Sequence, residues 1–308
     1  MTSKDIICVT SRSFSKNEKL VSILQEIYPE VRLNKSGNNL SEDQLVEFLQ
    51  GANKAIIGLE VIDKKILEKL PELKLISKYG VGLNNINLED CKKFNISVSF
   101  TPGSNSQTVA EFTLMQILLS LRKIHNNKTE ILDKVWSQEQ GLDLYKKNIA
   151  ILGFGNIGKK LLKLLVPFNV SIKIFDKEEF DKKQLKTFYS NLTQASLEET
   201  ISESDVISIH IPLSDDTSHM ISSKEFSYMK SNVCIVNSSR GGIVDESALH
   251  TFLNKNKKAF ACFDVFEEEP CFNSPLLELN NFFATSHRAS LTEEGIMAMG
   301  LAAIKGLN

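Results

Sequence analysis

One glycine pattern constrains this 308-residue chain more than any other feature. Gly153, Gly155 and Gly158 form a G-x-G-x-x-G that follows the apolar run 148–152 and opens a segment with helical spacing. In that setting the first glycine permits a tight turn, the second lets the backbone approach a pyrophosphate, and the third allows close helix packing. The phosphates would lie on amides at the helix N-terminus. The pattern predicts a dinucleotide-binding strand-turn-helix unit.

An acidic residue after the next predicted strand narrows the choice of dinucleotide. Asp176 lies 18 residues after Gly158, close to the offset of about 20 residues expected for an acid that binds the adenine ribose hydroxyls. A carboxylate there would repel a 2′-phosphate, so NAD is favoured over NADP. Three glycines can also make a tight turn in an α/β protein without a dinucleotide. The strand, the helix and the acid together favour cofactor binding.

Apolar strand-like runs alternate with helical patterns along the rest of the chain. The runs lie at 6–10, 31–33, 55–59, 73–77, 96–99, 172–175, 206–209, 233–237, 260–263 and 282–284. Such alternation is typical of right-handed βαβ crossovers and of parallel sheets covered on both faces. A long helical segment over 104–126 separates the two series and is expected to connect two lobes. The sequence predicts an α/β protein with two parallel-sheet lobes.

Composition excludes several classes of partner. Lys and Arg number 36 against 38 Asp and Glu, so no net field favours nucleic acid or an anionic membrane. The apolar run 6–9 is too short for a signal peptide, and the segment 112–121 falls short of the ~20 residues that a membrane helix needs. Five scattered cysteines fit a reducing compartment and predict neither disulfides nor a metal site. We therefore expect a cytoplasmic protein.

Three residues could carry acid–base chemistry beside a dinucleotide. His287 follows the last predicted strand, and ligand sites in open α/β sheets lie at the carboxyl ends of strands. Arg240 follows another strand and precedes two glycines, where its planar guanidinium can bind a carboxylate with two hydrogen bonds. Glu269 follows a third strand, and beside His287 it would fix the imidazole tautomer. Taken singly, Arg240 and Glu269 fit a surface ion pair equally well.

Five further sequence blocks occur in a characteristic order. They are Ser77-Lys-Tyr-Gly-Val-Gly-Leu-Asn-Asn, Thr101-Pro-Gly-Ser-Asn-Ser-Gln-Thr-Val-Ala-Glu, Asn237-Ser-Ser-Arg-Gly-Gly-Ile-Val-Asp-Glu, Phe263-Asp-Val-Phe-Glu-Glu-Glu-Pro and Thr285-Ser-His. Over nearly its whole length the chain resembles the D-isomer-specific 2-hydroxyacid dehydrogenase family, and most of all short phosphoglycerate dehydrogenases. The resemblance implies a flavodoxin-like substrate lobe of residues 1–100 plus 288–308, with a Rossmann NAD-binding lobe of residues 101–287 inserted in it. It also implies a homodimer formed through the segment after the long helix.

The same resemblance assigns roles to individual residues. His287 would exchange a proton with the substrate oxygen, Arg240 would hold the α-carboxylate, and Glu269 would keep the imidazolium available. The implied NAD contacts are Gly153, Gly155, Asn156, Ile157, Gly158, Asp176, His210, Pro212, Ser238, Ser239 and Asp264. The implied substrate contacts are Lys78, Val81, Gly82 and Asn105.

Departures from the family pattern bear on the substrate. The usual Thr-Pro-His-Ile-Gly block is Thr285-Ser-His-Arg-Ala here, which alters the loop of the proposed proton donor. Lys78 stands where phosphoglycerate enzymes often carry a phosphate-binding arginine, whereas Gly58 stands at the position of another. The leading hypothesis is oxidation of D-3-phosphoglycerate to 3-phosphohydroxypyruvate in serine biosynthesis. The alternatives are a reductase of glyoxylate, hydroxypyruvate or another 2-keto acid and, from a different class, a non-catalytic NAD-sensing binding protein.

Overall fold

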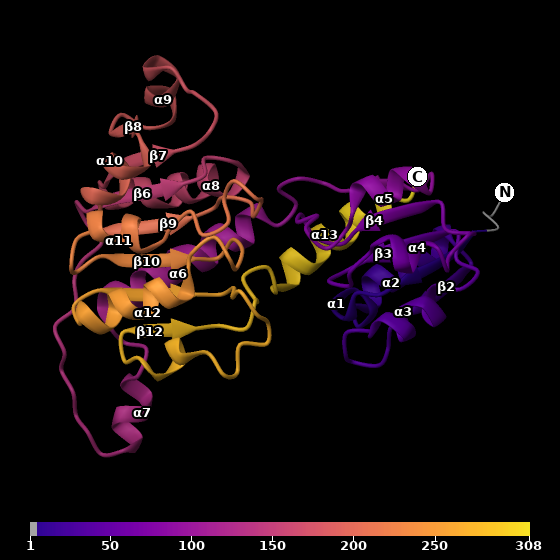
Figure 1. The fold of residues 1–308 in the computed structure, drawn as a ribbon, viewed down its shortest axis with the longest axis horizontal. Coiled ribbons are helices and arrows are strands. Elements are labelled where there is room, and N and C mark those ends of the chain that lie inside the picture. The colour runs from indigo at the N-terminus through magenta and orange to yellow at the C-terminus, as the bar shows by residue number, and fades with distance from the viewer. Residues whose placement is uncertain (1–4) are drawn as a thin grey trace. The chain divides into compact units, whose positions relative to one another are not determined.

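Two parallel β-sheets organise the computed structural model, which describes residues 5–308 (Figure 1). Residues 1–4, which the sequence analysis assigned to the substrate lobe, lie outside the described residues. The described residues divide into two compact units, residues 5–105 with 290–308 and residues 106–289. Each unit has its own sheet and its own apolar core, and this architecture confirms the predicted α/β fold with two parallel-sheet lobes.

The first unit is built on a five-stranded sheet with the order β2-β1-β3-β4-β5. Its strands are β1 (Ile6–Val9), β2 (Glu30–Leu33), β3 (Lys54–Ile57), β4 (Leu75–Lys78) and β5 (Ser97–Ser99). Its helices are α1 (Arg12–Ser15), α2 (Glu18–Ile27), α3 (Glu42–Leu49), α4 (Lys64–Leu67), α5 (Leu88–Lys93) and α13 (Glu293–Lys305). Side chains of β1 alternate between two cores, because Ile7 and Val9 pack with α2 and α13 while Cys8 packs with α3 and α4.

The last helix completes the core of the first unit. Helix α13 brings Met299 and Ile304 against Ile7 and Leu20. Gly300 lies so close to the Leu20 side chain that a Cβ there would collide with it. This close approach lets α13 pack directly on α2, so residues from both ends of the chain share one core.

The second unit is built on a seven-stranded sheet with the order β12-β11-β10-β9-β6-β7-β8. Its strands are β6 (Asn148–Leu152), β7 (Ser171–Phe175), β8 (Leu192–Gln194), β9 (Val206–Ile209), β10 (Cys234–Asn237), β11 (Phe260–Phe263) and β12 (Phe282–Ala284). Its helices are α6 (Ser106–Arg122), α7 (Asn127–Leu132), α8 (Asn156–Leu165), α9 (Lys182–Phe188), α10 (Leu197–Ser202), α11 (Ser223–Tyr228) and α12 (Glu246–Lys255), with short 3₁₀ turns at Val166–Phe168 and Pro275–Glu278.

The strand order of this sheet predicts where a ligand binds. The chain runs outward from β6 to β7 and β8, then returns to β9 on the other side of β6. Open α/β sheets bind ligands outside the carboxyl ends of strands at such a reversal. Helices α6 and α8 cover one face, and α10, α11 and α12 cover the other. The glycine pattern between β6 and α8 therefore lies at the reversal point.

Within the described residues no helix is long and apolar enough to cross a membrane. The five cysteines are free thiols. In the same part of the chain no group of three or more acidic, histidine or cysteine side chains is arranged to hold a metal ion.

Candidate active site

The glycine turn after β6 has the shape that a dinucleotide needs. Gly153 has a φ of 97°, and a Cβ there would lie only 2.6 Å from the carbonyl oxygen of His210. A Cβ on Gly158 would collide with the Gly153 carbonyl, so this glycine lets α8 pack against the turn. By contrast, a Cβ on Gly155 would meet no atom within 4 Å. The backbone at Gly155 is open to a ligand, and no side chain caps the first amides of α8.

Asp176 holds this turn from the end of β7. Its Oδ2 atom accepts a hydrogen bond from the Phe154 amide at 2.5 Å, and its Oδ1 atom accepts one from the Glu178 amide at 2.9 Å. The carboxylate therefore lies beside the glycine turn, where an acid for the ribose hydroxyls is expected. The turn, the open Gly155 backbone and this carboxylate fit NAD.

Replacing Asp176 with alanine is expected to weaken NADH binding and to relax discrimination against NADPH. Removal of the carboxylate removes both the ribose acceptor and the charge that repels a 2′-phosphate. Fluorescence titration with each cofactor measures the two dissociation constants. Glu179→Ala is the matched control, because it removes a neighbouring exposed acid that lies beyond the turn. An unchanged ratio of the two constants in Asp176→Ala contradicts this role.

Three neighbouring strands deliver the predicted acid–base residues to one edge of the sheet. Arg240 follows β10, Glu269 follows β11 and His287 follows β12, and these strands are adjacent in the order β12-β11-β10. The Nδ1 atom of His287 lies 2.8 Å from Oε2 of Glu269. Their side chains are 37% and 36% exposed, respectively. With Nδ1 donating to the carboxylate, the other ring nitrogen is available to exchange a proton.

A missing side chain brings Arg240 close to the Glu269 loop. A Cβ on Gly241 would collide with the carbonyl of Phe266, so the turn after β10 packs directly on the loop after β11. Desolvation by burial lowers the pKa of Arg240, and the nearby Glu269 charge opposes that shift. Burial raises the pKa of Glu269, but the hydrogen bond and charge of His287 outweigh it, helped by the Phe266 amide and by Arg240. The net pKa of Glu269 lies below its ordinary value, which keeps the carboxylate ionised as a partner for His287.

Asp264 fixes the loop that carries His287. Its side chain is fully buried. Oδ1 accepts hydrogen bonds from Thr285 Oγ1 at 2.6 Å and from the Arg288 amide at 2.9 Å, and Oδ2 accepts one from the Ala289 amide at 2.8 Å. His287 itself has a φ of 49°, a left-handed conformation that is uncommon outside glycine. The carboxylate thus holds residues on both sides of a strained position, a role that the sequence analysis did not assign to it.

His210 is a poor proton carrier. Burial lowers its pKa to about 3, so the ring is neutral near pH 7. Its Nε2 atom lies 2.8 Å from Ser208 Oγ, and its buried Nδ1 atom has no hydrogen-bond partner. Its place at the end of β9, beside Gly153, suits the predicted cofactor contact.

The remaining predicted cofactor contacts also belong to the second unit. Asn156 and Ile157 open α8, Pro212 is exposed after β9, and Ser238 and Ser239 are buried after β10. Their contact with NAD stays a prediction.

The predicted substrate contacts belong to the first unit. Lys78 ends β4 and is 5% exposed. Its Nζ atom donates to the Gly58 carbonyl and, at 2.8 Å, to Oδ1 of Asn85. Val81 and Gly82 are partly exposed in the following loop. Asn105 is buried with no hydrogen-bond partner for its Oδ1 atom. The ammonium of Lys78 is thus already engaged inside its own unit.

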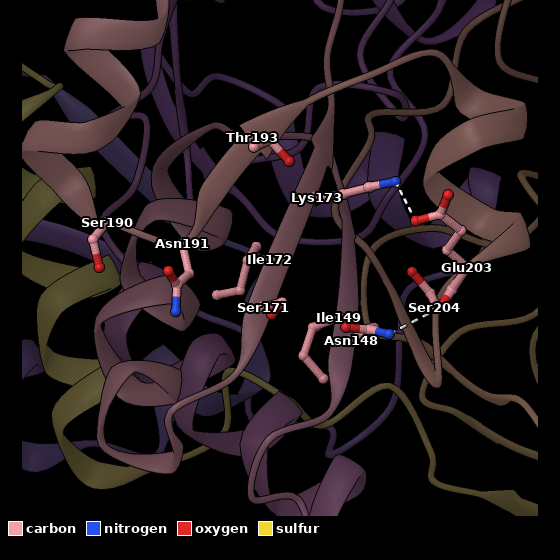
Figure 2. Close-up of a pocket in the computed structure, with 10 residues that line it drawn as sticks. All are labelled: Asn148, Ile149, Ser171, Ile172, Lys173, Ser190, Asn191, Thr193, Glu203 and Ser204. Atoms are coloured by element: carbon pink, nitrogen blue, oxygen red, sulfur yellow. Dashed lines mark hydrogen bonds and ion pairs between the residues drawn. The ribbon is translucent and has the colours of Figure 1, made fainter.

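A cavity of about 310 Å³ lies elsewhere in the second unit (Figure 2). It is lined around the amino ends of β6 and β7, by residues such as Asn148 and Ser171. Lys173 and Glu203 form an ion pair at its side. The glycine turn and the acid–base residues lie at the carboxyl ends of the strands, so this cavity is separate from the candidate active site.

Comparison with known proteins identifies a family and relatives that this chain is similar to. The family model "D-isomer specific 2-hydroxyacid dehydrogenase, NAD binding domain" matches residues 114–289. The D-3-phosphoglycerate dehydrogenase of Methanocaldococcus jannaschii is 32% identical over 288 residues, covering 92% of this chain and 54% of that protein. This chain therefore spans about half the length of that relative. The glyoxylate reductase of Thermococcus litoralis is 33% identical over 255 residues, covering 80% of this chain and 76% of that protein.

A solved structure is similar over nearly its whole length. The NAD⁺-bound 3-phosphoglycerate dehydrogenase of Entamoeba histolytica superimposes with a TM-score of 0.83 at 25% identity, covering 99% of this chain and 94% of that one. The cofactor bound in that structure is the one that the glycine turn and Asp176 fit.

Proposed function

Because this chain belongs to the D-isomer specific 2-hydroxyacid dehydrogenase family, we propose that it interconverts a small D-2-hydroxy acid and its 2-keto acid, with Arg240, Glu269 and His287 as the acid–base set. It is an NAD-dependent oxidoreductase of that family. The observation that carries the proposal is the contact between His287, which follows β12, and Glu269, which follows β11. Strand β11 lies next to β10, which Arg240 follows. The same contact favours catalysis over passive NAD sensing.

Each of the three side chains has a distinct task in this mechanism. During reduction, His287 donates a proton to the oxygen of the keto group; during oxidation, it takes the proton from the hydroxyl. Glu269 accepts the hydrogen bond from Nδ1 and stabilises the imidazolium when it forms. The guanidinium of Arg240 binds the α-carboxylate and polarises the carbonyl. NAD, when bound, supplies or accepts the hydride.

We propose that the two predicted lobes bind the cofactor and the substrate separately. We assign NAD binding to residues 101–287 and substrate binding to residues 1–100 with 288–308. Lys78, Val81, Gly82 and Asn105 are the proposed substrate contacts. Five free thiols suit a reducing compartment, which supports a cytoplasmic site of action.

Two substrate classes remain candidates for this mechanism. D-3-phosphoglycerate is the first, supported by the block pattern and by the relative from Methanocaldococcus jannaschii. An unphosphorylated 2-keto acid such as glyoxylate or hydroxypyruvate is the second, supported by the relative from Thermococcus litoralis. Lys78 favours the second class, because its ammonium already donates to the Gly58 carbonyl and to Asn85. These two hydrogen bonds use two of its three donors, and with 5% exposure little of the side chain is open to a phosphate.

One assay separates these candidates. The purified protein is given NAD⁺ with D-3-phosphoglycerate and, in parallel, NADH with glyoxylate, hydroxypyruvate or pyruvate, while absorbance follows NADH. Turnover confined to D-3-phosphoglycerate supports serine biosynthesis. Turnover confined to the keto acids keeps the mechanism and removes that pathway. An absence of turnover with every substrate, despite NADH binding, contradicts the proposed catalysis and favours an NAD-sensing role.

We also propose that the protein forms a homodimer through the segment after α6. Helix α7 has no buried residue, and Ile131, Leu132 and Trp136 are 50%, 71% and 79% exposed. Such a concentration of exposed apolar side chains is typical of an interface. A second copy of the same segment would cover it symmetrically.

Replacing Trp136 with glutamate is expected to convert this dimer to monomers. A charge in the middle of an apolar interface loses its hydration without gaining a partner. Light scattering coupled to size-exclusion chromatography measures the mass of each variant. Phe272→Glu is the matched control, because Phe272 is 83% exposed in another segment of the same unit. A wild-type protein that is already monomeric contradicts the proposed dimer.

A further inference from the structure

Helix α6 carries three polar side chains into the core of the second unit. Thr113, Gln116 and Ser120 are at most 2% exposed. Two of them satisfy their hydroxyls within the helix: Thr113 Oγ1 donates to the Val109 carbonyl at 2.8 Å, and Ser120 Oγ donates to the Gln116 carbonyl at 2.7 Å. Such bonds are the usual arrangement for hydroxyls inside a helix. The Gln116 carboxamide is different, because it reaches out of the helix.

The Gln116 side chain binds the loop that follows β10. Its Oε1 atom accepts a hydrogen bond from Ser238 Oγ at 2.6 Å. Its Nε2 atom is buried without a hydrogen-bond partner. A buried donor left unpaired destabilises a fold, and an apolar side chain of similar volume would avoid that penalty. The oxygen of this carboxamide is thus committed to Ser238, while its NH₂ group faces the core near the Cys262 thiol.

Ser238 begins the turn that presents the Arg240 guanidinium. Further along this turn, Asn237 accepts hydrogen bonds from the Ser239 amide at 3.0 Å and the Ser239 hydroxyl at 2.8 Å, and it donates to the Arg240 carbonyl at 3.0 Å. Arg240 Nη1 donates to the Ser239 carbonyl at 2.6 Å. Every residue from 237 to 240 is therefore tied either to its neighbours or, in the case of Ser238, to α6. Ser238 Oγ donates its proton to Gln116, which is the shorter of its two contacts with the helix, because Thr113 Oγ1 lies 3.4 Å away.

We propose that Gln116 is a positioning residue for the reaction, which anchors Ser238 and thereby fixes the direction in which the Arg240 guanidinium points. This inference rests on the proposed function, because it takes Arg240 as the group that binds the substrate carboxylate. Gln116 does not touch the substrate and acts only through Ser238 and its turn. Loss of the anchor therefore affects carboxylate binding and turnover, and leaves the fold intact.

The test compares Gln116→Met with Ser120→Ala. Methionine keeps the volume and length of glutamine but has no amide oxygen, and Ser120→Ala removes a buried hydroxyl from the same face of α6 without touching the turn. The measurements are kcat and KM for the best keto acid, the dissociation constant of oxamate from the NADH complex, and the melting temperature. We expect Gln116→Met to lower kcat/KM by about tenfold, since small misplacements of a substrate-binding group are costly. Oxamate should bind more weakly, and the melting temperature should be unchanged or higher. Ser120→Ala should keep the wild-type kcat/KM.

Two results would overturn the inference. One is a Gln116→Met enzyme with the kcat/KM and oxamate affinity of the wild type. The other is a parallel fall of melting temperature and activity, which assigns Gln116 a structural role. The double variant Gln116→Met with Ser238→Ala tests the route: it should be no worse than Ser238→Ala alone, and additive losses contradict a path through Ser238. Turnover by the wild-type enzyme in the same assay reports separately on the proposed function.

Discussion

Replacing His287 with asparagine should lower kcat by ~10²–10⁴-fold, the usual contribution of a positioned acid–base group. Asparagine keeps a polar side chain at the end of β12 but cannot exchange a proton near pH 7. NADH affinity should be unchanged, because no part of the glycine turn is altered. Steady-state kinetics and a fluorescence titration measure the two effects separately.

The chain offers a close control for this substitution. His219 also has a φ of 49° and also pairs with a carboxylate, Glu267, at 3.1 Å. It lies in the loop between β9 and α11, and its partner is Glu267 and not Glu269, which contacts His287. His219→Asn should therefore retain turnover, while His287→Asn loses it. A His287→Asn enzyme within a few-fold of wild-type kcat would remove His287 from the role of proton carrier.

Replacing Asp264 with asparagine should impair both stability and catalysis. The variant places an amide group where a carboxylate oxygen now accepts from Thr285, Arg288 or Ala289. At least one buried donor then loses its acceptor, at a cost of about 1–3 kcal/mol in the free energy of unfolding. Because the same bonds hold His287 in its left-handed conformation, kcat should fall by ~10²-fold as the imidazole shifts.

Three measurements separate this positioning role from the predicted NAD contact of Asp264. Urea denaturation gives the change in stability, steady-state kinetics gives kcat, and titration gives NADH affinity. A positioning role predicts losses in the first two with NADH affinity retained. Thr285→Val deletes one of the three hydrogen bonds that the Asp264 carboxylate accepts, so it should lower stability and kcat by less than Asp264→Asn does. Weakened NADH binding with normal kcat at saturating NADH would return Asp264 to cofactor binding.

The sequence predicted the parallel sheets well because their central strands are buried on both faces. Strands β9, β10 and β11 are buried along their whole length, so each appears as a mainly apolar run. The edge strand β8, Leu192–Gln194, was not predicted, since three residues with one buried side chain give no periodic signal. Helix α7 was also missed, because none of its residues is buried and its sequence reads as polar loop.

The site residues also differ in whether a local sequence pattern could reveal them. The glycine turn and Asp176 were recognisable because their roles depend on local backbone shape and a fixed spacing. The tasks of Asp264 and Gln116 depend on contacts between segments more than twenty residues apart, which no local pattern records. For Lys78 the sequence predicts a substrate contact from its position in a block, and the structure adds that its ammonium donates to the Gly58 carbonyl and to Asn85.

The insertion of one unit within the other fixes the order in which the two units can fold during synthesis. Residues 106–289 form a single stretch, so the second unit can finish folding as soon as that stretch has left the ribosome. The first unit must wait, because α13 follows the second unit in the chain and its Met299 and Ile304 complete the core around Ile7 and Leu20. Until then, the apolar side chains of the first unit that α13 covers, such as Ile7 and Leu20, remain exposed. These side chains therefore stay open to aggregation and to chaperones while the second unit is being made.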